Sequence, residues 1–357
     1  MNKRALGPIA FLAAACCILA ALASGGDSSD PLVSLSYLNG AFTDKVNSAV
    51  DARLNASGQT SADGGAYAAS TQEIRLKEGD VLGGSTGTDC LLLAGSMKVT
   101  FPSGAVVDIT TGKEVPSGTA LTANHRYLVA EDTTASFTVT SKTAVVHYEG
   151  PCRFTLSDSV DYNAIASALK ALHLFKGSYT GYGSGFDLEM APTRIQALIM
   201  FIRVLGEEEE ALSYTGPIPF TDIAKGSLSE HYVSYAYSRG YTNGFTATLF
   251  KPDQAISANQ YMEFLLRALG YSSSANTDLS ATMATARSAG VLTDAEAAML
   301  QSDTFLRAQL VYVSYYALDA ALSGGSGTLV QKLMDSGVFT SDELLSARAM
   351  ITGSRIF

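Results

Sequence analysis

The arrangement of hydrophobic and polar residues changes twice along the chain and so predicts three kinds of segment. A short basic start leads into an apolar run from Ile9 to Leu22. Between Glu73 and Glu149, short runs of strand-forming residues alternate with turns rich in glycine, proline and serine. After Pro151 the apolar residues recur with the period of an amphipathic α-helix. The pattern predicts an α+β protein in which an all-β sandwich or roll precedes an all-α region.

Residues 1–23 have the features of a secretory signal peptide. Two basic residues precede the apolar run, and Ala21-Leu22-Ala23 supplies the small residues that a cleavage site requires. The run is too short and too rich in alanine for a permanent membrane span. Cys16 and Cys17 suggest a lipoprotein as an alternative, but both lie inside the apolar run, in a poor context for lipidation. The sequence therefore predicts a secreted protein without a permanent membrane span.

Residues 24–70 are predicted to be a linker with one amphipathic helix, and residues 71–152 to be the β-domain. The helix has a single apolar stripe, formed by Phe42, Val46 and Val50. The β-domain is expected because turn signals separate at least six short runs of strand-forming residues. These runs are Cys90–Leu93, Lys98–Phe101, Val106–Ile109, Tyr127–Val129, Ser136–Val139 and Ala144–His147.

Two cysteines, Cys90 and Cys152, remain once the signal peptide is removed. In an exported protein they either form a disulfide that joins the two ends of the β-domain or stay as two separate buried thiols. The sequence leaves both alternatives open.

The helical half contains a unit that occurs three times, at residues 158–213, 214–273 and 274–323. Each copy is predicted to have a short helix closed by a glycine, then a loop, then a long amphipathic helix. The closing glycines are Gly177, Gly240 and Gly290, and the long helices are expected to begin near Pro192, Ala258 and Thr304. One copy is too small to bury its own apolar stripe, so the copies should pack on one another.

Local signals mark the ends of these helices. Ser257 and Gln260 have the spacing of a capping box at the start of the second long helix. Asp303 is expected to cap the third long helix. Residues 324–357 are predicted to form a tail with two further short helices around Gly337.

Four segments of the second copy resemble the S-layer homology (SLH) repeat. The segments are Pro219-Phe220-Thr221-Asp222-Ile223, Tyr232-Val233-Ser234-Tyr235-Ala236-Tyr237-Ser238-Arg239-Gly240, Phe250-Lys251-Pro252-Asp253 and Arg267-Ala268-Leu269-Gly270-Tyr271. The family pattern has an FxDV start, a YIxYAYxxG helix, an FxP loop, an ITRAE-type opening of the second helix and an ALGY ending. The first copy is similar at Ala191-Pro192-Thr193-Arg194 and the third at Phe305-Leu306-Arg307-Ala308-Gln309. The resemblance spans residues 158–323.

This resemblance implies a pseudo-threefold bundle of three repeats. Such bundles attach exported proteins non-covalently to secondary cell-wall polysaccharides of Gram-positive bacteria, which are often pyruvylated. The implied binding sites are grooves in which an arginine at a helix start and backbone N–H groups hold carboxylates and sugar hydroxyls. Arg194 and Arg307 match the motif arginine in the first and third copies, whereas the second copy has Ser257-Ala258-Asn259-Gln260 there.

The residues expected to bind the polymer are Thr193, Arg194, Arg307, Asp222, Asn259, Gly183 and Gly244. Asp222 is also expected to cap the turn that follows it. Gly181, Gly183, Gly185 and Gly244 are expected to adopt positive φ, with close approach of a sugar as a second role. The chain has no tryptophan, although many family members carry one ahead of the first helix. Binding by one or two grooves is therefore expected, and a degenerate bundle that serves only as a scaffold is the alternative.

Charge and motifs narrow the classes of function. Without residues 1–23, which hold two basic residues and no acidic one, the formal charge falls from −10 to −12. Such a protein is not expected to bind nucleic acid. Neither the spacing of a metal site nor a nucleophile elbow is present in the sequence, so no cofactor and no enzymatic activity are expected.

Two other interpretations remain beside the wall-anchoring one. The chain could be a structural component of a surface lattice, with the β-domain contacting other surface-layer proteins. It could also be a surface carbohydrate-processing enzyme, since the β-domain holds the carboxylates Asp108, Glu114, Glu131 and Asp132. In all three interpretations the protein acts at the cell wall or cell surface.

Overall fold

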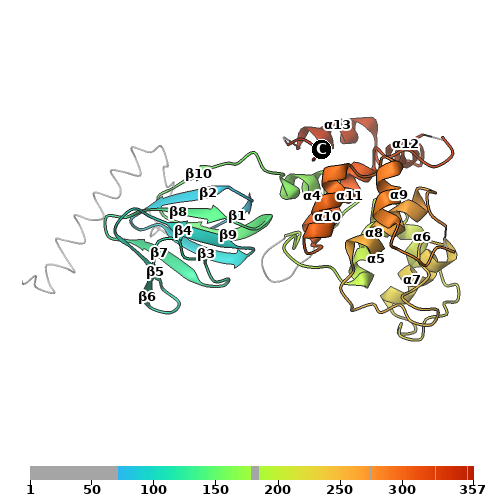
Figure 1. The fold of residues 1–357 in the computed structure, drawn as a ribbon, viewed down its shortest axis with the longest axis horizontal. Coiled ribbons are helices and arrows are strands. Elements are labelled where there is room, and N and C mark those ends of the chain that lie inside the picture. Colours follow the sequence, from blue (N-terminus) through green and yellow to red (C-terminus); the bar gives the residue numbers. More distant parts are fainter. Residues whose placement is uncertain (1–70, 178–184, 274, 326, 352) are drawn as a thin grey trace, which may run out of the picture. The chain divides into compact units, whose positions relative to one another are not determined.

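The computed structural model describes residues 71–177, 185–273, 275–325, 327–351 and 353–357 (Figure 1). The predicted signal peptide, the predicted helix at 42–50, Gly181 and Gly183 lie outside the described residues. Within the described ranges, no helix is long and apolar enough to cross a membrane.

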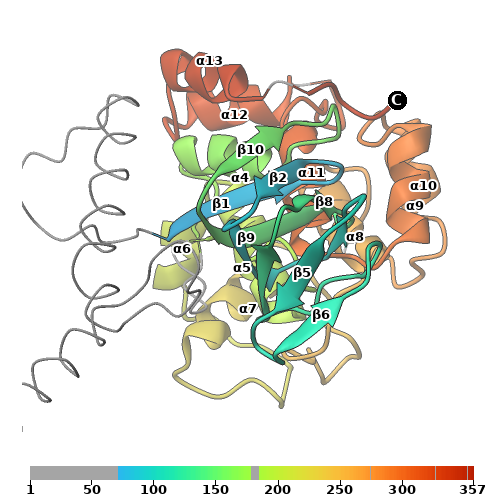
Figure 2. The ribbon, with the colours of Figure 1, turned by 90° about the vertical axis from the view of Figure 1, so that its left-hand side faces the viewer.

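The β-domain consists of two antiparallel sheets with a shared core (Figures 1 and 2). The strands are β1 (Gln72–Lys77), β2 (Val81–Ser85), β3 (Asp89–Ala94), β4 (Met97–Thr100), β5 (Ala105–Asp108), β6 (Lys113–Val115), β7 (Arg126–Ala130), β8 (Thr134–Val139), β9 (Thr143–Glu149) and β10 (Cys152–Thr155). One sheet has the order β1-β9-β3-β7-β5-β6 and the other β10-β2-β8-β4. Alternate side chains from both sheets are buried between them, among them Leu92 and Val146 from one and Leu82 and Phe137 from the other.

Each of the six predicted runs coincides with a strand, although Phe101 and Ile109 lie one residue beyond β4 and β5. Four strands escaped prediction. Three of these four, β1, β6 and β10, are edge strands of their sheets, where one side of the strand is unpaired and the pattern is more polar. The fourth, β2, contains Gly83 and Gly84, which are unusual inside a strand. A Cβ on Gly84 would come within 2.6 Å of the Thr88 side chain, so the glycine permits a close approach.

The two cysteines of the β-domain are free thiols in the structure. Cys90 lies on β3 and is buried, and Cys152 lies on β10 and is partly buried. Burial raises the pKa of both thiols above the ordinary value, which favours the uncharged and unreactive form. Of the two alternatives, the structure has the separate thiols.

The helical region follows the sheets, which confirms the α+β class. Its helices are α4 (Tyr162–Ala171), α5 (Arg194–Val204), α6 (Glu208–Ser213), α7 (Leu228–Ser238), α8 (Ala258–Ala268), α9 (Thr282–Ser288), α10 (Asp294–Ser302), α11 (Arg307–Ala317), α12 (Leu329–Asp335) and α13 (Ser341–Ala349). The helices α5, α8 and α11 are each 11 residues long, and each contacts the other two. Their apolar faces form one continuous core. The tail contains α12 and α13 on either side of Gly337, as predicted.

The long helices begin with the same polar contact. The side chains of Gln196, Gln260 and Gln309 each accept a hydrogen bond from the backbone N–H three residues earlier. This confirms the capping box predicted at Ser257. The predicted start of the third helix is wrong, because α11 begins at Arg307 with Leu306 as its N-cap, and Asp303 instead follows α10.

The prediction that Gly177 closes the first short helix is also wrong. The helix α4 ends at Ala171, and the left-handed residue after it is His173, with φ of 63°. Leu174 N–H then donates to the Leu169 carbonyl at 2.9 Å, which is the Schellman closure. Gly240 and Gly290 occupy the same position after α7 and α9, with φ of 73° and 70°. Histidine is one of the few non-glycine residues that tolerate this conformation.

Arg355, after the predicted third copy, takes a place that Arg267 takes next to α8. In the second copy, Arg267 on α8 donates to Glu263 and to the Tyr241 carbonyl, one residue after Gly240. Tyr316 stands at the corresponding place of α11, ten residues into the helix, and the Arg355 guanidinium lies 5.1 Å from its ring centroid.

Arg355 makes the contacts that Arg267 makes in the second copy. It donates to both oxygens of Glu296 at 2.8 Å and to the carbonyl of Val291 at 2.8 Å, one residue after Gly290. Glu296 is fully buried and also accepts from the Tyr312 hydroxyl. The chain end is thus part of the folded core.

Removal of the Arg355 guanidinium should strongly destabilise the helical region. Arg355→Ala leaves the Glu296 carboxylate buried without its cation, which costs about 3–5 kcal/mol in comparable pairs. Chemical denaturation would measure this loss. The control is Arg348→Ala, which breaks the exposed pair with Asp319 and should change the free energy of unfolding by less than about 1 kcal/mol. Equal effects of the two substitutions would contradict a structural role for the chain end.

Glu208 should make folding sensitive to acid. Burial alone raises the pKa of this carboxyl, but hydrogen bonds from Lys176, Tyr232 and Arg203 outweigh burial and lower the pKa to about 2. A lowered carboxyl pKa stabilises the fold above the unfolded value, and this stabilisation is lost as the pH falls from 4.5 towards 2.

The variant Glu208→Gln tests this linkage. At pH 6 its free energy of unfolding should be about 2 kcal/mol below that of the wild type, and the difference should shrink towards zero near pH 2. Urea titrations at several pH values measure the difference. Glu209→Gln, at an exposed position of the same helix, is the control and should show no such trend. A pH-independent difference for Glu208→Gln would refute the linkage.

Candidate functional site

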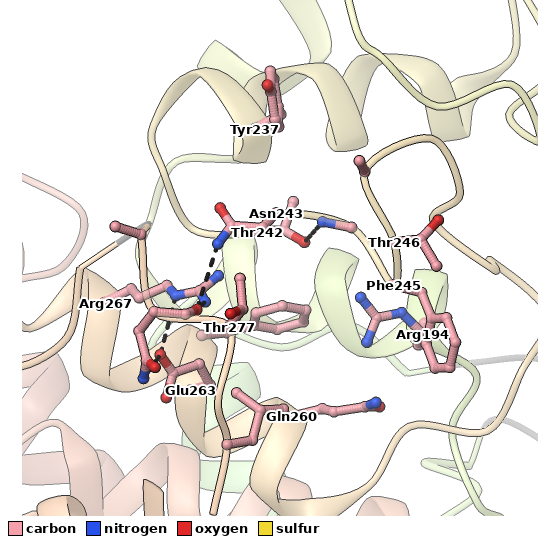
Figure 3. A pocket seen from close by; sticks show the side chains of 16 residues that line it. Arg194, Tyr237, Thr242, Asn243, Phe245, Thr246, Gln260, Glu263, Arg267 and Thr277 are labelled. Atoms are coloured by element: carbon pink, nitrogen blue, oxygen red, sulfur yellow. Dashed lines mark hydrogen bonds and ion pairs between the residues drawn. The ribbon is translucent and has the colours of Figure 1, made fainter. Parts of the chain in front are cut away.

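A groove of about 620 Å³ lies between the start of α5, the loop from α7 to α8, and α8 itself. It is called the Arg194 groove below and is lined in part by Arg194, Gly244, Phe245, Glu263, Phe264 and Arg267. Figure 3 shows Arg194 on one side of the groove, with Arg267 and Glu263 on the other. The groove therefore joins residues of the first predicted copy to residues of the second.

Arg194 is the first residue of α5 and is only 3% exposed. Its Nε donates to the Phe250 carbonyl at 2.9 Å. The guanidinium carbon lies 4.9 Å from the ring centroid of Phe250 and 5.9 Å from that of Phe264, within the range of cation–π attraction. Arg194 thus packs its charged group between two aromatic rings.

No acidic side chain among the described residues forms an ion pair with Arg194, and its two terminal nitrogens have no hydrogen-bond partner there. Burial, followed by repulsion from Arg267, lowers the pKa of Arg194 to about 10, while Asp222 acts in the opposite direction. The group is still a cation at neutral pH. Arg194 is therefore a buried positive charge without a counter-ion, beside an open groove.

Asp222 holds the loop that carries the Phe250 carbonyl. Its two carboxylate oxygens accept hydrogen bonds from the backbone N–H groups of Phe250 at 2.9 Å and Lys251 at 2.7 Å. Lys251 has a φ of 57°, and these bonds stabilise that conformation. The prediction that Asp222 caps the turn directly after it is wrong, because its partners lie 28 and 29 residues further along the chain. Asp222 positions the acceptor for Arg194.

Gly244 shapes the loop wall of the groove. Its φ of 84° confirms the predicted left-handed conformation, and an added Cβ would lie 2.2 Å from the Phe220 ring. The same prediction is wrong for Gly185, whose φ lies outside the positive region. Gly244 therefore allows the loop to pass close over Phe220.

The pair of Glu263 and Arg267 on α8 was not predicted as part of the site. Glu263 is 2% exposed and accepts from four donors, namely Arg267 Nε, Ser272 Oγ, Asn276 Nδ2 and Thr282 Oγ1. Arg267 also donates to the carbonyls of Tyr241 at 3.2 Å and Asn276 at 2.6 Å. The only signal in the sequence was a glutamate and an arginine four residues apart within an apolar helix face.

The first-turn amides of α5 are already bonded, as are those of α11. Arg194 and Ile195 donate through their backbone N–H groups to the carbonyls of Gln254 and Pro252. On α11, Arg307 N–H donates to Met190 and Ala308 N–H to Leu188. These four amides therefore have partners within the protein. Thr193 is the N-cap of α5, where its hydroxyl accepts from the Gln196 N–H.

The remaining predicted residues lie outside the Arg194 groove. Arg307 occupies the first position of α11, as Arg194 does in α5, and is 8% exposed. Its Nε is buried without a hydrogen-bond partner among the described residues, and burial lowers its pKa. Asn259 lines a separate pocket at the start of α8 and donates to the Leu279 carbonyl at 3.1 Å. The predicted residues therefore do not form one site.

Comparison with known protein families finds a match for one segment of the chain. Residues 219–257 match the model of the S-layer homology domain, from Pro219 to the N-cap of α8. This confirms the resemblance for the second copy, whereas the presence of three repeats stays a prediction. No curated protein matches the chain.

Two solved structures illustrate the remaining similarities. The recombinant pro-11S globulin of pumpkin has 9% identity and a TM-score of 0.17, and procruciferin, an 11S globulin from Brassica napus, has 11% identity and a TM-score of 0.16. In each case the similarity covers 28% of this chain and 28% of the globulin.

Gly244→Ala should lower the free energy of unfolding by more than the strain of a left-handed alanine alone. Gly244→Ala combines a left-handed alanine with a clash against Phe220, and should lower the free energy of unfolding by about 2 kcal/mol or more. Gly226→Ala is the control, because Gly226 has a φ of 73° and nothing lies near its added Cβ. The control should lose only about 1 kcal/mol. Equal losses in thermal or chemical denaturation would show that the loop moves away from Phe220 freely.

Proposed function

We propose that this protein is anchored at the bacterial cell surface through an anionic cell-wall polysaccharide that binds in the Arg194 groove. The observation that carries this proposal is the buried cation of Arg194, which has no counter-ion within the described ranges and lines an open groove. The match to the S-layer homology domain supports the same function, because domains of that family bind cell-wall polymers.

The energetics of Arg194 favour an anionic ligand. A buried charge without a partner costs free energy, and a ligand carboxylate would offset this cost when it binds. The terminal nitrogens of a guanidinium match the two oxygens of a carboxylate in a bidentate pair. Because Nε is already bonded to Phe250, the terminal nitrogens are the donors that remain for a ligand.

The groove walls suit a sugar. The rings of Phe245 and Tyr237 are each 41% exposed, and such rings can pack on the apolar face of a pyranose. Thr242, Gln260 and Thr277 place hydroxyl and amide groups along the same groove. A ligand with one acidic group and several hydroxyls would therefore find a partner for each.

We further propose that α5, α8 and α11 belong to three S-layer homology repeats in a pseudo-threefold bundle. Their equal lengths, their pairwise contacts and their shared glutamine caps support this arrangement. Arg307 would then provide a second binding groove, whereas Ala258 leaves the corresponding helix start without a cation. In this proposal the chain is secreted, binds the wall without catalysis, and presents the β-domain to other surface-layer proteins.

Binding to purified wall sacculi tests the function. Wild-type protein should sediment with sacculi, and acid extraction of the secondary polymer should remove this retention. Arg194→Met should reduce retention by about tenfold or more, because a charge-assisted pair contributes about 1.5–3 kcal/mol. The double variant Arg194→Met with Arg307→Met should show still lower retention than Arg194→Met alone.

The control substitution is Arg287→Met, at an exposed arginine paired with Asp294. It should leave retention unchanged. Arg194→Met should keep its free energy of unfolding within about 1 kcal/mol of wild type, because removal of an unpaired buried charge offsets the lost hydrogen bond and cation–π contacts. Full retention of the Arg194→Met protein would rule out this groove as the anchor.

A further inference from the structure

The charge of the Arg194 groove depends on one carboxylate. Among its lining residues only Arg194, Glu263 and Arg267 are charged. Glu263 and Arg267 form an ion pair at 3.2 Å on one side, so their charges cancel. Arg194 on the other side has no such partner among the described residues. Of the two arginines that line the groove, only Arg194 thus lacks an ion pair among the described residues.

We propose that Glu263 determines the specificity of this groove. By neutralising Arg267, Glu263 fits the groove to a saccharide with a single negative charge, such as a carboxylate-bearing sugar. A doubly charged phosphate monoester would find only one cation for its two charges. The inference rests on the proposed function for the source of the ligand, but the charge selection itself is a property of the groove.

The geometry holds Glu263 and Arg267 together firmly. Besides Arg267, three neutral donors bind the Glu263 carboxylate, which is therefore fixed in its orientation. Arg267 uses Nε for Glu263 and both terminal nitrogens for backbone carbonyls. These three bonds fix the guanidinium in place, and its charge is paired with Glu263. Arg194, by contrast, keeps its terminal nitrogens for the groove.

Without Glu263 the groove would contain two unpaired guanidinium groups. Each further negative charge on a ligand would then gain an attractive partner, which at short range and partial burial corresponds to about tenfold in affinity. The gain would be larger for a dianion than for a monoanion. Glu263 therefore changes the ratio of the affinity for a dianion to the affinity for a monoanion.

A purely structural role for Glu263 predicts a different result. Ser272, Asn276 and Thr282 belong to the segment that forms one wall of the groove, and Glu263 holds all three. If Glu263 only held this wall, its loss would weaken every ligand alike. The ratio of affinities separates the two roles.

The experiment compares two probe sugars on the full chain. Methyl glucuronoside carries one carboxylate, and glucose 6-phosphate carries close to two charges at pH 8 because its second pKa is about 6. Isothermal titration or NMR titration gives the affinity of each probe. Wild type should prefer methyl glucuronoside. Glu263→Gln should shift the ratio about tenfold towards glucose 6-phosphate and steepen the salt dependence of its binding.

Two further variants test the charge explanation. Glu263→Gln combined with Arg267→Gln removes both charges and should restore the wild-type ratio, although it disturbs the wall more. Arg267→Gln alone leaves Glu263 unpaired, so it should shift the ratio about tenfold away from glucose 6-phosphate. This single variant tests the proposal even if Glu263→Gln does not fold. Glu296→Gln is the matched control, since Glu296 is another buried carboxylate paired with arginine outside the groove.

Several results would overturn the inference. An unchanged ratio in Glu263→Gln, or a double variant that fails to restore it, would leave Glu263 with a structural role only. Absence of binding of both probes to every variant would also overturn it, while retention on sacculi would still support the proposed function. A shifted ratio in a protein that is not retained on sacculi would support the inference and contradict the proposed anchoring.

Discussion

The helical region depends on hydrogen bonds between loops and helix starts that are distant in sequence. The first N–H groups of a helix lack partners within the helix and must find them elsewhere. In α5 they bind the carbonyls of Pro252 and Gln254, and in α11 those of Leu188 and Met190. These bonds lock separate copies together and place the first side chain of the helix beneath a neighbouring loop. The burial of Arg194 and Arg307 is a consequence of this contact.

The same constraint distinguishes residues 274–323, which were predicted to form the third copy. A corresponding loop from the third copy would have to bind the start of α8, yet the described residues offer no backbone carbonyl to the first two amides there. The helix α10 occupies the chain between α9 and α11 instead. Ala258 carries no charge that would have to be buried at the start of α8. In residues 274–323 no arginine stands at the place of Arg267, and Arg355 supplies the guanidinium instead. The start of α8 therefore differs from those of α5 and α11 both in its first residue and in the partners of its first amides.

Periodicity was sufficient to predict the elements that bury a regular face. It predicted α5, α8, α11 and six of the ten described strands, because their apolar residues repeat with the period of the structure. It failed where a single residue departs from the commonest choice, as His173 does in a position that glycine usually takes. It also failed for contacts between distant segments. Neither the bond from Arg194 to the Phe250 carbonyl nor the brace from Asp222 has a local signal in the sequence.

The two arginines of the groove, Arg194 and Arg267, have different roles although they are the same residue type. Arg267 bonds its own chain through each of its three side-chain nitrogens and is paired with Glu263, so it stabilises the wall. Arg194 has one bond and two aromatic contacts, which are enough to fix its position but not to compensate its charge. A site that must hold an anion needs a cation of the second kind, because full satisfaction within the protein would leave nothing for the ligand to gain. The unsatisfied charge is thus a stability cost that the fold tolerates because the interlocked loops hold it in place.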